Sequence, residues 1–318
     1  MRTRRVFCFK GRTMTPASFP KPPLTIDQQI DLLLERGLSI PDREHVRHLL
    51  THINYYRLRA YWLPFEFKDD RGQHAYRRGI TLEEILLLYD FDRELRLLLL
   101  DAIERVEISL RARWAHSLAL KYGSFAHTNP DLFRRRDVWE TCKEELEKEY
   151  RRSREVFAEH YRNNYNHLEL PPIWVACELM ALGHISRWLQ NLKNPTDRQH
   201  IADAYELDEK VLVSFTHHLS IVRNHCAHHG RIWNRLFSMK MQIPRKKPAG
   251  LANSFNPVED GRIGNTMTLL AYLIRIVSPR STWHRRFICL VESHPTISPK
   301  EMGFKEDWRQ DEIWRVPT

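Results

Sequence analysis

The chain has 318 residues, 42% of them hydrophobic, so it can bury one large core or two modest ones without disulfides. Its 50 Lys and Arg against 40 Asp and Glu give a net charge of +10, which makes a polyanion such as nucleic acid the first partner to consider. The five scattered cysteines never form a Cys-x-x-Cys pair, and no apolar run is long enough to span a membrane. We therefore expect no disulfide framework, no thiolate zinc site and a cytoplasmic location.

The first elements follow a basic, proline-containing segment. Residues 1–23 hold six basic and no acidic side chains and lack the apolar stretch of a secretory signal, so we expect a basic flexible arm. Apolar residues then recur at helical spacing from Thr25, and Gly37 predicts the end of this helix. Pro41 and Asp42 predict the start of a second helix.

An aromatic stretch at residues 54–64 comes next. Side chains such as these stack on unpaired bases in single-strand readers, but packing in a core is the more common role and is what we expect here. The residues concerned are Tyr55, Tyr56, Tyr61 and Trp62.

The strongest helical pattern covers residues 81–121. It predicts one long core helix, or two helices joined near Asp90, with Gly123 as the end. Residues 134–155 are charged almost throughout and predict a solvated helical projection or hairpin. A helix through Trp188 should follow, closed at Asn194, and a last helix is expected around residues 267–277. No alternating pattern is long enough to build a sheet.

A helix predicted from Leu207 to about His229, with Gly230 as its C-cap, carries the candidate chemistry. On a helical wheel its apolar residues gather on one side, while Asn224 and His228 lie one turn apart on the other. Arg223 lies on the flank between the two faces. The apolar set is Val211, Phe215, Leu219, Val222 and Cys226.

This polar cluster suits cleavage of RNA by its own 2′-hydroxyl. Histidine is the natural general acid or base near neutral pH, which assigns that role to His228. The guanidinium of Arg223 can bind the non-bridging phosphate oxygens, and Asn224 can orient the imidazole or the phosphate. The substrate supplies the nucleophile, so we expect no metal and no cofactor. Because one helix offers one such histidine, a homodimer with a composite cleft is predicted.

The run from Arg223 to His228 resembles the Arg-polar-x-x-x-His signature of the HEPN superfamily, whose helical members include many metal-independent ribonucleases. Residues 24–65 and three later runs also resemble the Abi-like family of bacterial abortive-infection proteins, the AbiD/AbiF group, in the same order. The later runs are 103–108, 179–183 and 223–235. The resemblance implies a toxin that cleaves RNA in antiphage defence, and some relatives are similar to toxins restrained by a small RNA.

The predicted fold is therefore all-α, a HEPN-type helical bundle with a helical N-terminal extension. The expected order is the basic arm at 1–23, an Abi-like HEPN domain at 24–240 with the charged hairpin inserted at 134–155, and a basic loop with a C-terminal helical extension at 241–318. Expected partners are RNA as substrate, a regulatory small RNA and a second copy of the chain, with no membrane.

Basic residues that follow the candidate helix predict a phosphate track, because no acid interrupts them. They are Arg231, Arg235, Lys240, Arg245, Lys246 and Lys247. Arg231 and Asn234 have two interpretations, in which they either hold substrate or cap the end of the helix.

Two carboxylates, Glu104 and Glu107, are candidate supporting residues. One of them could orient Arg223 or His228 from a neighbouring helix, whereas the ordinary alternative is a local ion pair between Glu107 and Arg111.

Three alternatives to the nuclease stay open. The first is a HEPN protein that sequesters a cognate small RNA without substantial cleavage, and a helix-turn-helix DNA regulator is a weaker one. The third is a metal site at His225, His228 and His229, whose spacing lets pairs of them share a helix face.

Overall fold

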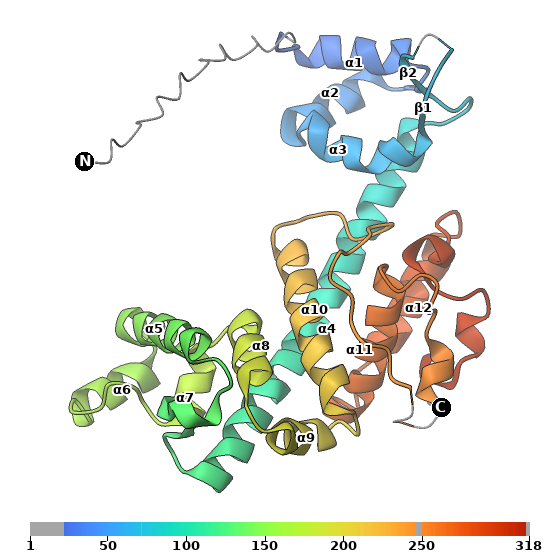
Figure 1. Cartoon of the computed structure of the whole chain (residues 1–318). Coiled ribbons are helices and arrows are strands. Elements are labelled where there is room, and N and C mark those ends of the chain that lie inside the picture. Colours follow the sequence, from blue (N-terminus) through green and yellow to red (C-terminus); the bar gives the residue numbers. More distant parts are fainter. Residues whose placement is uncertain (1–21, 71, 246–247, 249, 316–318) are drawn as a thin grey trace, which may run out of the picture. The chain divides into compact units, whose positions relative to one another are not determined.

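The computed structural model describes residues 22–70, 72–245, 248 and 250–315, which form two compact units divided after Leu82 (Figure 1). The all-α prediction is confirmed, because helices dominate both units and the described residues contain only one small sheet, of two strands. The predicted basic arm at 1–23 lies outside the described residues except for its last two.

The first unit consists of three helices and a β-hairpin. Thr25 caps the first helix in a reciprocal arrangement with Gln28, and Gly37 follows the helix end with φ +89°, a backbone conformation that glycine adopts without strain. Asp42 caps the second helix, so both predicted starts are confirmed. The elements are α1 (Ile26–Glu35), α2 (Arg43–His52), α3 (Tyr55–Trp62), a 3₁₀ turn (Leu63–Phe65), β1 (Glu66–Lys68) and β2 (His74–Tyr76), the two strands being antiparallel.

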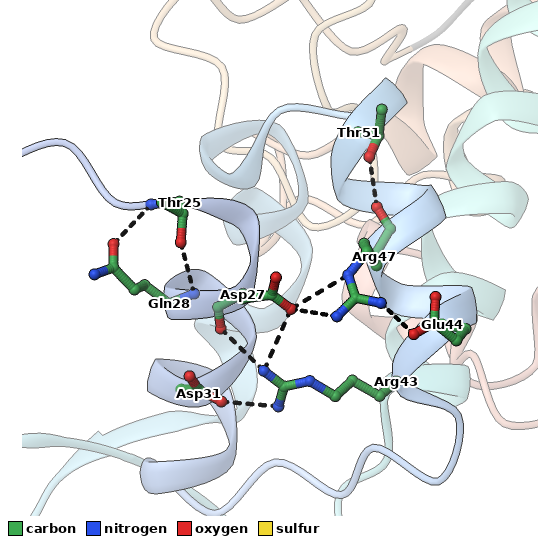
Figure 2. Close-up of polar contacts among 8 residues, drawn as sticks. All are labelled: Thr25, Asp27, Gln28, Asp31, Arg43, Glu44, Arg47 and Thr51. Atoms are coloured by element: carbon green, nitrogen blue, oxygen red, sulfur yellow. Dashed lines mark hydrogen bonds and ion pairs between the residues drawn. The ribbon is translucent and has the colours of Figure 1, made fainter.

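Helices α1 and α2 are joined by a charged cluster on the surface (Figure 2). A carboxylate oxygen of Asp27 accepts hydrogen bonds from Arg47 at 2.5 Å and from Arg43 at 3.4 Å, and Arg43 also reaches Asp31 at 2.8 Å. Arg47 additionally pairs with Glu44 along α2. The hydrogen bond from Arg47 is the main cause that lowers the pKa of Asp27. Because these groups are exposed, salt weakens their interactions. The cluster therefore fixes the position of α1 against α2 more than it adds to the free energy of unfolding.

The aromatic stretch 54–64 packs mostly inward, as expected. Trp62 is fully buried and Tyr61 almost so, and the rings of Tyr55 and Trp62 meet edge to face at 5.0 Å. Tyr56 is 66% exposed and lies outside this core.

The second unit is built around α4 (Leu82–Tyr122), one continuous helix of 41 residues. Of the two predicted alternatives, a single long helix is therefore the correct one. Gly123 follows its end with φ +88°, as predicted. One stripe of apolar residues along this helix is buried, and it contains Leu95, Leu99, Ala102, Val106 and Leu110.

Eight further helices complete the second unit. They are α5 (Arg136–Arg152), α6 (Val156–Asn164), α7 (Ile173–Ala176), α8 (Leu182–Asn191), α9 (Pro195–Asp203), α10 (Glu209–Ala227), α11 (Ile263–Val277) and α12 (Trp283–Ser293). Short 3₁₀ turns lie at Ala126–Thr128, Pro130–Leu132, Cys177–Leu179, Leu251–Ser254, Pro299–Met302, Trp308–Gln310 and Glu312–Trp314.

Several elements differ from the sequence predictions. The helix expected through Trp188 is broken into α7 and α8, because Met180 and Ala181 are extended. Asn194 caps α9 in addition to following α8, with Pro195 at the first helical position, where proline loses no hydrogen bond. Helices α3, α6, α9 and α12 were not predicted, and neither was the short hairpin of β1 and β2.

The charged segment 134–155 forms one helix and not the predicted hairpin, and this helix is not solvated all round. Helix α5 buries one face against α8, and the charged side chains occupy the other face. The buried residues are Trp139, Cys142, Leu146 and Tyr150.

The segment after residue 240 packs within the second unit. Trp283 of α12 donates a hydrogen bond from its indole Nε1 to the carbonyl oxygen of Leu98 on α4, at 2.8 Å. Aromatic rings from α12 and the last turns surround it in one cluster. The cluster contains Phe287, Phe304, Trp308 and Trp314.

One buried histidine makes the stability of the second unit depend on pH. His127 is fully buried, and this burial lowers its pKa to about 4 from an ordinary 6.5. Its carbonyl oxygen accepts a 2.9 Å hydrogen bond from the indole of Trp139. Because the folded state binds the proton less well than the unfolded state, stability is fully present above pH 6.5 and is lost as the pH falls toward 4.

We expect His127→Gln to flatten this pH dependence. Between pH 6.5 and 4 the free energy of unfolding of the natural chain should fall more steeply than that of the variant, by about 1.4 kcal/mol per pH unit. Urea unfolding at several pH values measures both slopes, and a uniform loss of stability in the variant does not affect the comparison. Equal slopes would contradict a neutral buried His127.

Candidate functional site

The candidate site lies at the C-terminal end of α10, which begins after the N-cap Asp208. The apolar face predicted for this helix is confirmed, since each of its five residues is at most 6% exposed. Helix α10 packs against α8 and α9 (Figure 1), and beyond its first turn its other face is exposed only near the C-terminal end.

Arg223, Asn224 and His228 lie together on that other face. Asn224 and His228 are exposed and Arg223 is partly exposed, so none of them belongs to the core. Arg223 donates a hydrogen bond from Nη1 to Oδ1 of Asn224 at 3.3 Å, and the backbone N–H of His228 donates to the carbonyl oxygen of Asn224 at 2.9 Å. The arrangement presents a guanidinium, an amide and an imidazole on one surface.

A strained turn ends the helix directly beyond His228. The N–H of Gly230 bonds the carbonyl oxygen of His225 at 2.7 Å and that of His229 bonds Cys226 at 3.0 Å, the pair of bonds of a Schellman motif. The predicted C-cap Gly230 is therefore wrong: His228 is the C-cap, and His229 takes the left-handed conformation with φ 58°. Gly230 has a different role, because a Cβ there would lie 3.3 Å from Nδ1 of His225.

A buried carboxylate holds the segment that follows this turn. One oxygen of Asp92, on α4, accepts the backbone N–H groups of Ile232 at 3.0 Å and of Trp233 at 2.6 Å. Asp92 is fully buried and pairs with Arg96, itself 4% exposed, one turn along α4. Burial, and then the charge of Asp92, raises the pKa of Cys226 to about 12, so this thiol stays protonated at neutral pH.

His225 is the inward neighbour of the exposed cluster. Its ring lies 5.8 Å from that of Phe237, centroid to centroid. Burial lowers its pKa, and the charges of Arg235 and His228 lower it further, so the neutral imidazole is favoured. The contact of its ring with Phe237 and the hydrogen bond from Gly230 to its carbonyl oxygen assign His225 to the support of the helix end.

Comparison with known protein families shows to which family the chain belongs. A family model described as Abi-like protein matches residues 48–234, which is more than half of the chain. The chain belongs to the Abi-like protein family. No curated protein and no solved structure matches it significantly.

The Abi-like match contains every part of the site described above. It includes Asp92 and the cluster on α10, and it ends at Asn234, a second non-glycine residue in the left-handed conformation, with φ 49°. Family membership associates the chain with abortive-infection defence.

Glu104 and Glu107 are the predicted supporting carboxylates. Their surroundings differ from those that the functional hypothesis requires. Glu107 is 9% exposed and pairs with Arg111 on its own helix, as the local alternative predicted, and Arg111 also lies 3.6 Å from Glu178. Glu104 is exposed. Within the described residues, no hydrogen bond or ion pair joins either of them to Arg223 or His228.

The basic residues after α10 do not form a uniform track. Arg235 donates to the carbonyl oxygen of Arg231 at 3.3 Å and stacks over Phe237, and Lys240 forms an ion pair with Asp260 at 2.7 Å. Arg245 is exposed. Lys246 and Lys247 lie outside the described residues.

Of the two roles considered for Asn234, its contacts support the structural one. Its side-chain oxygen accepts a hydrogen bond from Arg262, which precedes α11. This contact ties the turn after α10 to the start of α11.

Two further observations concern metals and membranes. In the described part of the chain, His, Cys, Asp and Glu side chains do not gather in a group of three or more that could hold a metal ion. No helix among the described residues combines the length and apolar character needed to cross a bilayer.

Sequence reasoning missed Asp92 and Arg96, which position the site. A signal was present, because Asp92 and Arg96 are an acid and a base one turn apart, and each directly follows an apolar position of the buried stripe, Phe91 and Leu95. Their targets, the amides of Ile232 and Trp233, carry no recognisable local pattern.

We expect His229→Gly to stabilise the second unit. Glycine adopts the left-handed conformation without the penalty that a Cβ imposes, so the free energy of unfolding should rise by about 1 kcal/mol. His229→Ala is the matched control, since it removes the imidazole and keeps the Cβ. Urea unfolding compares the two variants, and an equal change in both would contradict strain at this position.

Proposed function

We propose that this Abi-like protein is a metal-independent endoribonuclease of HEPN type that acts in antiphage defence. The observation that supports it most is the exposed trio of Arg223, Asn224 and His228 at the end of a helix whose following turn is held by a buried carboxylate. A site on a rigid element keeps its geometry better than one on a loop, and these residues face solvent, where a strand can reach them.

The proposed reaction is an internal transfer at phosphorus. The 2′-oxygen of one nucleotide attacks the adjacent phosphorus, its proton passes to an imidazole, and the bond from phosphorus to the 5′-oxygen breaks. A second imidazole, protonated at the outset, gives its proton to the leaving 5′-oxygen. The products are a 2′,3′-cyclic phosphate and a 5′-hydroxyl, with the guanidinium of Arg223 on the non-bridging oxygens that gain charge.

This reaction calls for two histidines over one phosphate. His228 and His229 are adjacent in sequence and do not share a face of the helix end, and His225 is partly buried with its ring against Phe237, so we assign one histidine of the required kind to each chain. A second copy of α10, related by a two-fold axis, supplies the other. We therefore propose a homodimer with RNA lying across the junction of the two clusters.

We expect His228→Ala to lower the rate of RNA cleavage at least about 100-fold, the usual effect of removing a general acid or base. His116→Ala is the control, because His116 is also an exposed histidine of the second unit. The assay follows new 5′-hydroxyl ends in the presence of a chelator, and circular dichroism checks that both variants fold. An unchanged rate in folded His228→Ala would refute the assignment, and bound but uncut RNA with the natural chain would favour a protein that sequesters RNA.

A site shared between two chains leads to a second prediction, which concerns the natural chain. On dilution below the dissociation constant of the dimer, the cleavage rate per chain should fall in proportion to protein concentration, because only paired chains hold two histidines. Analytical ultracentrifugation over the same concentrations gives the fraction of dimer. A constant rate per chain on a monomeric protein would rule out a site shared between copies.

A further inference from the structure

Three adjoining cavities form one groove in the second unit, away from the candidate site. Their volumes are about 610, 600 and 190 Å³. Ser278 lines all three, and Arg105 lines the two larger ones, so the cavities are continuous. The groove runs from the middle of α4 and Tyr205, before α10, to the connection between α11 and α12.

The groove lies at the opposite end of α10 from His228. Tyr205 comes shortly before the first residue of α10 and His228 directly after its last, and a helix of 19 residues is about 28 Å long. It is therefore a separate site from the cluster of Arg223, Asn224 and His228.

The lining of the groove is basic and rich in hydroxyl groups. Among the described residues that line the three cavities there is no carboxylate. Asp101 behind the lining pairs with Arg105 at 2.9 Å and with Arg286, and holds their guanidinium groups in place. No ion pair of Arg113 or Arg280 is present among the described residues. The basic lining consists of Arg105, Arg113, Arg275, Arg280, Arg285 and Arg286.

One wall of the groove is apolar. Ile108 is 52% exposed and Ile276 is 36% exposed, although both are large aliphatic side chains. Beside them the hydroxyls of Ser109 and Tyr205 are hydrogen bonded at 2.9 Å. Guanidinium groups next to an apolar wall match a ligand with phosphates along one side and bases along the other.

The spacing of the arginines favours a strand over a single nucleotide. Arg105 and Arg113 are two turns apart on α4, which separates them by about 12 Å along the helix axis. Successive phosphates of a strand can contact both side chains where they stand, whereas a mononucleotide would require both to bend toward one polyphosphate. Arg280 and Arg286 extend the basic lining beyond Arg105.

We propose that this groove binds the sugar-phosphate backbone of a single-stranded RNA segment. The choice of RNA over other strands rests on the proposed function. Arg105, Arg113, Arg280 and Arg286 contact phosphates, and the aliphatic wall contacts bases. The chain then holds RNA at two places along α10, at His228 and at the groove.

The test compares two double variants in a His228→Ala background, which removes cleavage from the measurement. Arg113→Gln with Arg280→Gln removes two charges from the groove, and Arg151→Gln with Arg154→Gln removes two exposed charges near the end of α5. Fluorescence anisotropy measures binding of a labelled uridine oligonucleotide at several salt concentrations, after circular dichroism has checked folding.

We expect the groove variant to bind about tenfold more weakly than its parent and the α5 control to change little. The slope of log affinity against log salt should fall by about 1.4 in magnitude in the groove variant, at about 0.7 for each lost phosphate contact on a single strand. Equal weakening in both variants, or no weakening in either, would overturn the proposal.

A competition experiment distinguishes binding of a strand from binding of a free nucleotide. ATP should displace the oligonucleotide only at concentrations far above those at which unlabelled oligonucleotide does, and equal potency would overturn the assignment to a strand. The proposed function can fail independently: a natural chain that cleaves no RNA, while the groove variant loses binding, would leave the groove in place and remove the nuclease.

Discussion

The carboxylate of Asp92 is the interaction on which the candidate site depends. It is buried, and a buried charge is tolerated only with close partners, which here are Arg96 and the backbone amides of Ile232 and Trp233. These amides belong to the segment that leaves α10, so the contact fixes the path of the chain directly after His228. Loss of the carboxylate would remove the buried ion pair with Arg96 and free the segment at the same time.

Because Asp92 fixes the segment after α10, the turn at the end of this helix can keep an unfavourable backbone conformation. His229 and Asn234 are held in the left-handed conformation without being glycine, a strain that persists only where the surroundings over-determine the backbone. On one side of this turn lie the buried Cys226 and Asp92, and on the other the exposed His228. The result is an exposed polar cluster on a rigid base, with a basic groove at the other end of the same helix.

The helical spacing of apolar residues in the sequence predicted the features of the fold that depend on local burial. The apolar face of α10 and the ends at Gly37 and Gly123 could be read directly, because a helical repeat and a left-handed glycine are local signals. The contact of Asp92 with Ile232 could not, since the two are 140 residues apart in sequence. The break between α7 and α8 has neither proline nor glycine at Ala181 to announce it.

Hydrogen exchange at the amides of Ile232 and Trp233 tests the central role of Asp92 most directly. In the natural chain both amides should exchange as slowly as those of the buried core of α4, and in folded Asp92→Ala both should exchange at least about 100-fold faster, because the acceptor is gone. Rapid exchange of these amides in the natural chain, or slow exchange that the substitution leaves unchanged, would contradict the account.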